Sequence, residues 1–192
     1  MKNIIENSLS KAQKVLDEFI SNPENIARIE TAAMIIAKAI ADGKKIIACG
    51  NGGSLCDATH FAEELTARFR NNRKALPAIA INDPAFITCS LNDFSPTSIF
   101  ARYVEAMGQE GDVLLAISTS GNSQNVLEAV DMARERGMKV IALTGKSGGK
   151  LAQNCDVEIR APMSDYSDRV QEIHIKVIHI FVECIESFIF SK

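Results

Sequence analysis

The stretch "VLLAISTSGNS", residues 113–123, leads from an apolar run directly into a loop of small hydroxyl residues. Its first six residues are apolar at nearly every position, which is typical of a strand covered on both faces in a parallel sheet. Similar short runs occur at 45–49, 77–81 and 139–143, and a more alternating run occurs at 156–160. We therefore predict five strands, with 156–160 as a candidate edge strand.

Between these runs, apolar residues recur at helical spacing. This spacing predicts two helices before the first strand, at 3–20 and 25–42, and later helices at 54–70, 97–107, 122–137 and 166–190. The alternation of strands and helices predicts a three-layer α/β fold, with a parallel five-stranded sheet flanked by helices and two additional N-terminal helices. Because no linker or repeat divides the chain, we expect one domain over 1–192, including the helical pair 1–42.

The composition bears on whether the protein binds nucleic acid, in which compartment it occurs and whether it spans a membrane. The 192 residues carry a net charge of -3 with both signs mixed along the chain, so charge alone gives no reason to expect binding to nucleic acid. Five cysteines without a CxxC pair are typical of a reducing compartment. The N-terminus lacks the apolar core of a signal peptide, and charged residues interrupt the apolar stretch 173–190. We expect a cytosolic protein without a membrane span.

Ligands of open parallel sheets bind at the carboxyl ends of the strands, which directs attention to two loops. The loop "GNGGS", 50–54, allows close backbone approach to a ligand but matches neither GxGxxG nor a P-loop, and a tight turn without a ligand is equally compatible. The second loop places four hydroxyls at a predicted helix start, which favours a bound phosphate over a simple helix cap: Ser118, Thr119, Ser120 and Ser123.

Two helical segments hold the three histidines. His60 and Glu64 lie about 6 Å apart in rise and about 40° apart around a helix, so both could reach one ion, and zinc suits such ligands. Taken alone, this pair is better explained as a solvated polar face. Glu63, about 100° further around, is not in register with His60.

The segment 168–179 supplies polar groups on a helix otherwise rich in isoleucine and valine: Gln171, Glu172, His174 and His179. They are candidates for a buried polar site, although hydrogen bonding in the core or at a subunit contact is the better explanation for His174 or His179 alone. Gln171 and His179 lie about 12 Å apart along a continuous helix and about 80° apart around it. They could share an ion if both side chains reached towards it, if the helix began later, or if two subunits supplied the ligands.

Taken together, the motifs "CGNGGS", "HFAEEL", "ND", "ISTSGNS", "LTGKSGG" and "RVQEIHIKVIH" resemble the phosphoheptose (sedoheptulose 7-phosphate) isomerases of the sugar isomerase, or SIS, superfamily. The resemblance runs in order from about residue 45 to 180. The serine-rich loop is shared across SIS domains, whereas "HFAEEL" combined with "QEIHIKVIH" is much narrower.

The resemblance implies a homotetramer with active sites between subunits and one Zn²⁺ per subunit, bound by His60, Glu64, Gln171 and His179. It implies that sedoheptulose 7-phosphate becomes D-glycero-D-manno-heptose 7-phosphate through an enediol, as the first step of ADP-heptose supply for the lipopolysaccharide core. Glu64 would be the base and His179 the partner acid or base. Because tight zinc binding weakens a carboxylate as a base, we expect Glu64 to hold the metal loosely.

By the same resemblance, the four hydroxyl residues Ser118, Thr119, Ser120 and Ser123 would hold the phosphate. The remaining candidates for substrate contact are Asn51, Gly52, Gly53, Arg68, Asn92, Asp93, Asp168 and Gln171. The sequence departs from the commonest family pattern at Leu55, Leu91 and Ser95, which affects loop shape rather than any motif side chain.

Two other functions are compatible with the same superfamily. Some SIS relatives are non-catalytic tetrameric adaptors that bind a replication-initiator protein, and these lack the acidic pair and the second histidine. The presence of Glu63, Glu64 and His179 favours an enzyme. The other alternative is a different sugar-phosphate isomerase or a sugar-phosphate sensor.

Overall fold

A computed structural model describes residues 1–190. The strands are β1 (Ile46–Gly50), β2 (Ala78–Ala80), β3 (Val113–Ser118), β4 (Lys139–Thr144) and β5 (Val157–Arg160). The helices are α1 (Lys2–Ser21), α2 (Pro23–Ala41), α3 (Gly53–Thr66), α4 (Pro84–Asp93), α5 (Ile99–Met107), α6 (Gln124–Glu135) and α7 (Ser167–Phe190), with a short 3-10 turn, η1, at Leu151–Gln153.

The five strands form one parallel sheet in the order β2-β1-β3-β4-β5. Along the centre of the sheet, Ala48 pairs with Leu115 and Leu115 pairs with Ile141. The predicted parallel sheet and the prediction of 156–160 as an edge strand are both confirmed, and β2 forms the other edge.

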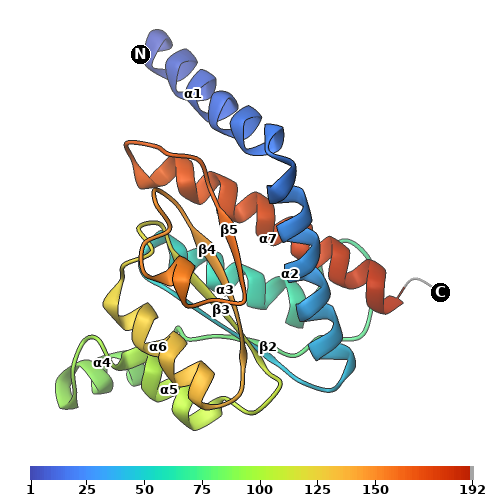
Figure 1. Ribbon diagram of the computed structural model, residues 1–192, viewed down its shortest axis with the longest axis vertical. Coiled ribbons are helices and arrows are strands. Elements are labelled where there is room, and N and C mark those ends of the chain that lie inside the picture. The colour runs from blue at the N-terminus through green and yellow to red at the C-terminus, as the bar shows by residue number, and fades with distance from the viewer. Residues whose placement is uncertain (191–192) are drawn as a thin grey trace.

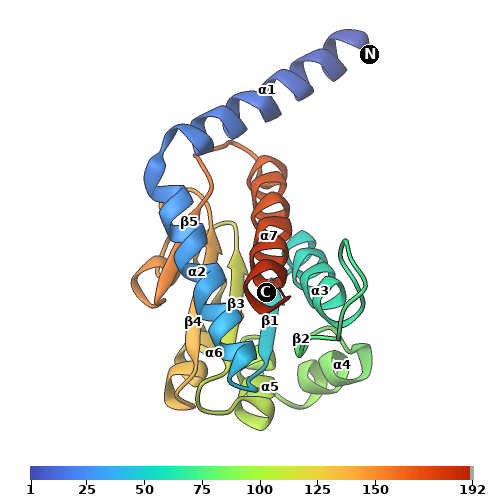
Figure 2. The same cartoon turned by 90° about the vertical axis from the view of Figure 1, so that its right-hand side faces the viewer.

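The sheet is the middle of three layers, with α2, α3 and α7 on one face and α4, α5 and α6 on the other (Figures 1 and 2). Successive residues of one strand point to opposite faces, so Leu114 packs towards α5 and α6 while Leu115 packs towards α2, α3 and α7. Both faces are covered, which explains why the strand sequences are almost continuously apolar.

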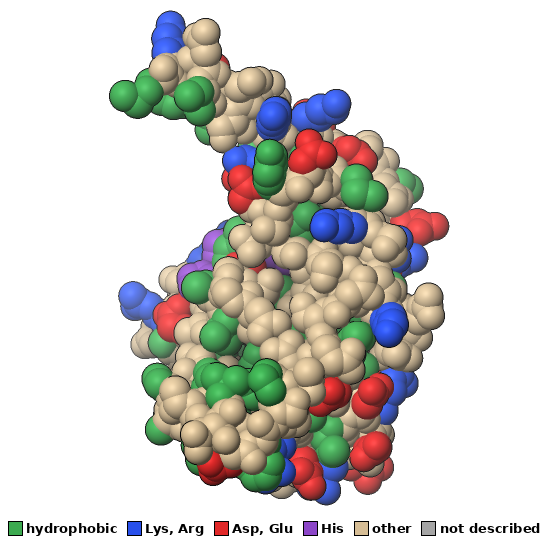
Figure 3. Space-filling view, turned by 90° about the vertical axis from the view of Figure 1, so that its left-hand side faces the viewer, with side chains coloured by type: hydrophobic (Ala, Val, Ile, Leu, Met, Phe, Trp, Pro, Cys, Tyr) green, Lys and Arg blue, Asp and Glu red, His purple; other side chains and the backbone are tan. Residues whose placement is uncertain are grey.

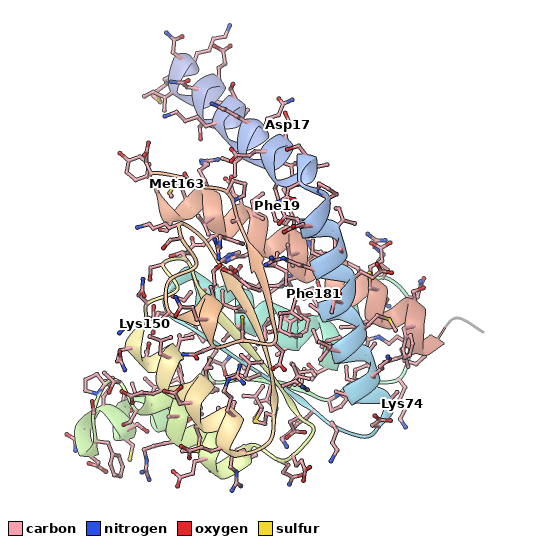
Figure 4. The ribbon with its side chains drawn as sticks, viewed as in Figure 1. Asp17, Phe19, Lys74, Lys150, Met163 and Phe181 are labelled. Carbon is pink, nitrogen blue, oxygen red and sulfur yellow. The ribbon has the colours of Figure 1, made fainter. Side chains whose placement is uncertain are left out.

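The layer that carries the site packs around two phenylalanines. Phe181 of α7 lies inside this layer (Figure 4) and meets Phe61 of α3 edge to face, with ring centroids 6.5 Å apart. Both side chains are fully buried. This contact joins α3 and α7 along the length where their polar residues occur.

Two features differ from the prediction. Residues 84–93 form α4, a helix that the apolar periodicity does not predict, although Asp83 caps it by accepting a hydrogen bond from the Phe86 N–H and Pro84 occupies its first turn. In addition, α3 ends at Thr66 rather than near 70, so Arg68 lies beyond the helix.

Helix α1 extends away from the layered body (Figures 1 and 2), and Phe19 is its buried residue. Apolar side chains remain exposed along α1, among them Ile4, Ile5 and Leu9. Within residues 1–190, no helix combines the length and apolar character needed to cross a membrane.

Candidate active site

The helices α3 and α7 bring three metal-ligand side chains together. His60 of α3 and His179 of α7 face one another with their Nε2 atoms 3.0 Å apart, and the His60 Nε2 atom lies 3.3 Å from Glu64 Oε1. All three side chains are partly buried. Figure 3 shows histidine side chains reaching the surface in one small area of the molecule, so the cluster is open to a ligand on one side.

The geometry of this cluster fits a zinc ion. One ligand atom from each of His60, Glu64 and His179 lies within 4.8 Å of the other two. Zinc binds nitrogen and oxygen at about 2.1 Å, which places any two ligands of a tetrahedral site about 3.4 Å apart. The observed separations of 3.0 and 3.3 Å are close to that spacing. The donor set of two imidazoles and one carboxylate is also one that zinc accepts.

A second carboxylate approaches His60 from its other side. Glu63 Oε2 lies 3.5 Å from His60 Nδ1, so the two ring nitrogens of His60 face different carboxylates. The helical spacing had set Glu63 apart from the ion site, and the structure gives it a contact suited to orienting the imidazole. The ring of Phe69 packs against the other histidine, and its centroid lies 5.8 Å from that of His179.

Gln171 lies further along the same pair of helices. Helix α7 is continuous from Ser167, which excludes a helix start after Gln171. The Gln171 amide packs against Gly53, where a Cβ atom would come within 2.5 Å of its Nε2 atom. Gly53 precedes His60 by seven residues, about 10 Å along α3. Two of the options that the sequence leaves open therefore remain. Gln171 and His179 could share an ion if their side chains reached towards it, or if two subunits supplied the ligands.

The hydroxyl loop at the end of β3 is compact. Ser118 Oγ lies 3.0 Å from Ser123 Oγ and 3.5 Å from Ser120 Oγ, at the N-terminus of α6. Gly121 allows this turn with a φ of 66°, and a Cβ atom there would lie 1.9 Å from the Gly148 carbonyl oxygen. Three converging hydroxyls at a helix N-terminus form an arrangement that can bind a phosphate. Thr119 belongs to the loop but directs its carbonyl oxygen towards Gly145.

Comparison with known proteins identifies the family. The SIS domain pattern matches residues 9–145. Phosphoheptose isomerase from Enterobacter sp. (strain 638) is 58% identical over 185 residues, which cover 96% of each chain. The chain belongs to the phosphoheptose isomerase family. It is therefore an aldose-ketose isomerase of the sugar-phosphate class. The relative from Vibrio cholerae is 55% identical over 96% of this chain and 97% of its own.

A solved structure agrees with this membership. The phosphoheptose isomerase from Neisseria gonorrhoeae superimposes with a TM-score of 0.91 at 38% identity, covering 97% of this chain and 98% of that chain. The three-layer SIS fold expected from the sequence is therefore confirmed.

In this member of the phosphoheptose isomerase family, a reciprocal amide pair joins the glycine loop to α6. Asn51 and Asn125 exchange two hydrogen bonds of 2.9 and 2.8 Å. Beside them is a cavity of about 300 Å³, and Leu55 and Leu91 both line it. Leu55 and Leu91, two of the positions expected from the sequence to depart from the common family pattern, therefore share one cavity wall next to the glycine loop.

Four other predicted site residues form no hydrogen bond or ion pair with these groups within residues 1–190. Asn92 and Asp93 are exposed at the end of α4 and hydrogen-bond to one another, with 2.7 Å between the Asn92 Nδ2 and Asp93 Oδ1 atoms. Arg68 is exposed beyond α3. Asp168, in the first turn of α7, pairs with the neighbouring Arg169 at 3.3 Å.

Two buried titratable groups lie behind the site. His174 is fully buried and its Nε2–H donates to the Thr144 carbonyl oxygen at 2.8 Å, as expected for a core histidine. Burial lowers the pKa of His174 to about 4, so the ring is neutral at neutral pH. Burial raises the pKa of Asp57 to about 6, an effect that the nearby His60 opposes. Among residues 1–190, Asp57 Oδ2 and His174 Nδ1 are the buried side-chain polar atoms without a hydrogen-bond partner.

Proposed function

We propose that this protein is a zinc-dependent isomerase that converts sedoheptulose 7-phosphate into D-glycero-D-manno-heptose 7-phosphate in the cytosol. This reaction would be the first step of ADP-heptose supply for the lipopolysaccharide core. The observation that carries the proposal is the convergence of His60, Glu64 and His179 from two helices, with ligand atoms within 4.8 Å of one another. The family names of the relatives support the substrate.

The reaction moves a hydrogen between C1 and C2 of the sugar. The Glu64 carboxylate takes a proton from C1 of the ketose while His179 supplies a proton to the C2 oxygen, which gives an enediol. His179 then takes the proton of the C1 hydroxyl while Glu64 returns its proton to C2, which yields the aldose and restores both groups. A bound zinc would polarise the sugar carbonyl and stabilise negative charge on its oxygen, with His60, Glu64, His179 and Gln171 as its proposed ligands.

The phosphate end of the substrate would bind at the β3–α6 loop. Ser118, Ser120 and Ser123 bring three hydroxyls together there, and the positive end of the α6 dipole favours an anion. Thr119 belongs to the same proposed set. The proposed sugar contacts are Asn51, Gly52, Gly53, Arg68, Asn92, Asp93, Asp168 and Gln171.

We further propose a homotetramer with active sites between subunits. The exposed apolar residues of α1, such as Ile4 and Leu9, support it because a helix that extends from the body needs a partner to cover such side chains. Light scattering coupled to gel filtration tests this proposal. The wild type should elute at four times the chain mass and an Ile4→Lys, Leu9→Lys variant at a lower mass, whereas a monomeric wild type would contradict it.

One experiment tests the catalytic proposal. The purified protein is analysed for bound metal by mass spectrometry and incubated with sedoheptulose 7-phosphate, and the aldose product is followed. Zinc and conversion are expected together; the absence of both would overturn the proposal. Ligand binding without turnover would indicate a sensor, and activity on pentose or hexose phosphates instead would indicate a different isomerase.

The adjacent carboxylates provide a matched pair of variants. Glu64→Gln should abolish turnover while the fold and bound zinc survive, because the amide cannot accept the C1 proton. Glu63→Gln changes the same charge one residue away and should keep measurable turnover, because Glu63 faces the opposite ring nitrogen of His60. Turnover retained in Glu64→Gln would refute its role as the base.

A further inference from the structure

A buried arginine after α3 connects the two helices of the site. The Arg73 side chain is 4% exposed, and its guanidinium lies 2.6 Å from the Glu64 carbonyl oxygen and 2.8 Å from that of Leu65. Its Nε atom lies 2.7 Å from Glu186 Oε1 on α7, and the Glu186 side chain is 13% exposed. One guanidinium therefore contacts the end of α3 and the side of α7 at the same time.

The contacts on α3 satisfy a need of the helix itself. The last four carbonyl groups of an α-helix lack partners within the helix, and α3 ends at Thr66, so the carbonyls of Glu64 and Leu65 are among them. No basic residue occurs in the last turn of α3. Arg73 donates to both carbonyl oxygens, of which that of Leu65 also accepts from the Leu76 N–H at 3.0 Å, and it places a positive charge at the negative end of the helix dipole. It acts as the C-terminal cap of α3 from outside the helix.

Through Glu186, Arg73 also contacts α7, the helix that carries the proposed catalytic residue His179. Glu186 follows His179 by seven residues, which is about two turns and places both side chains on nearly the same face of α7. Glu64 offers its carbonyl oxygen to Arg73 and its carboxylate to the ion site. The buried ion pair thus links the Glu64 backbone to the helix that carries His179, in addition to the apolar contact between Phe61 and Phe181.

We propose that Arg73 and Glu186 form a positioning pair that fixes α3 against α7 and so sets the separation of Glu64 and His179. This inference rests on the proposed function for the roles of those two residues. Arg73 contacts the Glu64 backbone, but within residues 1–190 none of its hydrogen bonds reaches a proposed metal-ligand atom or the phosphate loop, so its effect would be on geometry. An arginine fork buried against carbonyl and carboxylate oxygens is well suited to this task because it is planar and permanently charged.

The chain contains a matched control. Arg70 and Glu183 also form an ion pair between the same loop and α7, but their side chains are 58% and 53% exposed. Exposed ion pairs of this kind contribute little to the stability of the folded protein. Replacing either pair removes the same charges between the same elements, and only the buried pair holds the end of α3.

The test measures kcat, KM for sedoheptulose 7-phosphate, zinc affinity by chelator competition, and thermal unfolding in Glu186→Gln, Arg73→Lys and Glu183→Gln. Glu183→Gln is preferred to a change of Arg70, because the Arg70 guanidinium also lies over the ring of Phe69, which packs against His179. Glu186→Gln leaves the cap on α3 in place and removes the charged tie to α7. We expect its zinc affinity and kcat to fall by about tenfold or more, the scale seen when groups supporting metal ligands are lost. Its KM should change by less than about twofold, because the proposed phosphate loop lies on other elements.

Arg73→Lys should retain folding and part of the kcat, because an ammonium supplies the charge without the fork. Glu183→Gln should match the wild type in kcat and zinc affinity, because Glu183 is exposed and its ion pair does not hold the end of α3. The inference is overturned if Glu186→Gln and Glu183→Gln behave alike, or if Glu186→Gln loses thermal stability with unchanged kcat and zinc affinity.

A crystal structure of Glu186→Gln separates this inference from the proposed function. It reports the separation of the His60 and His179 Nε2 atoms, 3.0 Å in the wild type, without reference to activity. An altered separation supports the positioning role even if the wild type fails to convert the heptose. An unchanged separation contradicts it even if the wild type is active.

Discussion

His60 Nε2 lies 3.0 Å from His179 Nε2, although the two residues are 119 positions apart in the chain. The contact exists because α3 and α7 lie side by side on one face of the sheet, joined by the buried Phe61–Phe181 contact. The proposed chemistry therefore depends on packing between two helices as much as on the ligand residues themselves.

The hydroxyl loop can be tested at Ser118. Its Oγ atom lies within 3.5 Å of the hydroxyls of both Ser120 and Ser123, so Ser118→Ala removes the centre of the proposed phosphate site. We expect KM for sedoheptulose 7-phosphate to rise by about tenfold, since a hydrogen bond to a charged group contributes about 1.5–3 kcal/mol. Steady-state kinetics measures this change, with the exposed Ser147→Ala as control. Equal KM values in the two variants would argue against phosphate binding here.

Gly121 should tolerate no side chain. A Cβ atom would lie 1.9 Å from the Gly148 carbonyl oxygen, and the φ of 66° is itself unfavourable for other residues. Gly121→Ala is expected to lower the free energy of unfolding and to raise KM. Gly43→Ala separates the two causes, because Gly43 has a φ of 75° with nothing within 4 Å of its Cβ position. Chemical denaturation should show a loss of about 1 kcal/mol for Gly43→Ala and a larger loss for Gly121→Ala.

His174 should make stability depend on pH. Its pKa falls from 6.5 to about 4 because burial disfavours the charged ring, so below pH 6.5 the unfolded chain takes up a proton that the folded chain resists. This group's contribution is complete above pH 6.5 and is lost as the pH falls through about 4, by about 3 kcal/mol in total. A His174→Gln variant should lack this part of the pH dependence in urea denaturation between pH 7 and 4. A parallel decline in both proteins would contradict the prediction.

Asp57 should make stability depend on pH in the direction opposite to His174. Burial raises its pKa from 3.8 to about 6, so the folded chain binds a proton more readily than the unfolded chain. The stabilising contribution is present below pH 3.8 and is lost as the pH rises through about 6, which leaves a buried charge at neutral pH. Asp57→Asn is therefore expected to raise the thermal unfolding temperature at pH 8 more than at pH 5. A variant less stable than the wild type at pH 8 would show that the carboxylate has a stabilising partner.

The sheet could be predicted closely from sequence because its strands are buried on both faces. The run at 113–118 coincides with β3, where each residue is buried. Helix α4 was not predicted because its apolar residues are only partly covered, as Phe86 and Ile87 are, so they form no strong periodic pattern. Its recognisable signal is the Asp83-Pro84 pair, a capping residue followed by a proline suited to a first turn.

The site was only partly accessible to reasoning from the residues. Helical spacing identifies His60 and Glu64 as neighbours, but the approach of His179 depends on tertiary packing, and only the resemblance to a family joined the three. The role of Arg73 is harder still to predict from the sequence, because an arginine in a polar loop usually points into solvent. Its burial becomes visible only when the end of α3 and the position of Glu186 on α7 are both known.

The sheet described above has edges that discourage further strands from joining it. At one side, β2 contains only three residues and follows Pro77, which has no N–H to donate; at the other, β5 contains four residues, two of them the charged Glu158 and Arg160. Short, charged or proline-flanked edges give an incoming strand little to pair with. Copies of this chain are therefore directed to associate through helical surfaces, and sheet extension of the kind that begins fibrous aggregation is disfavoured.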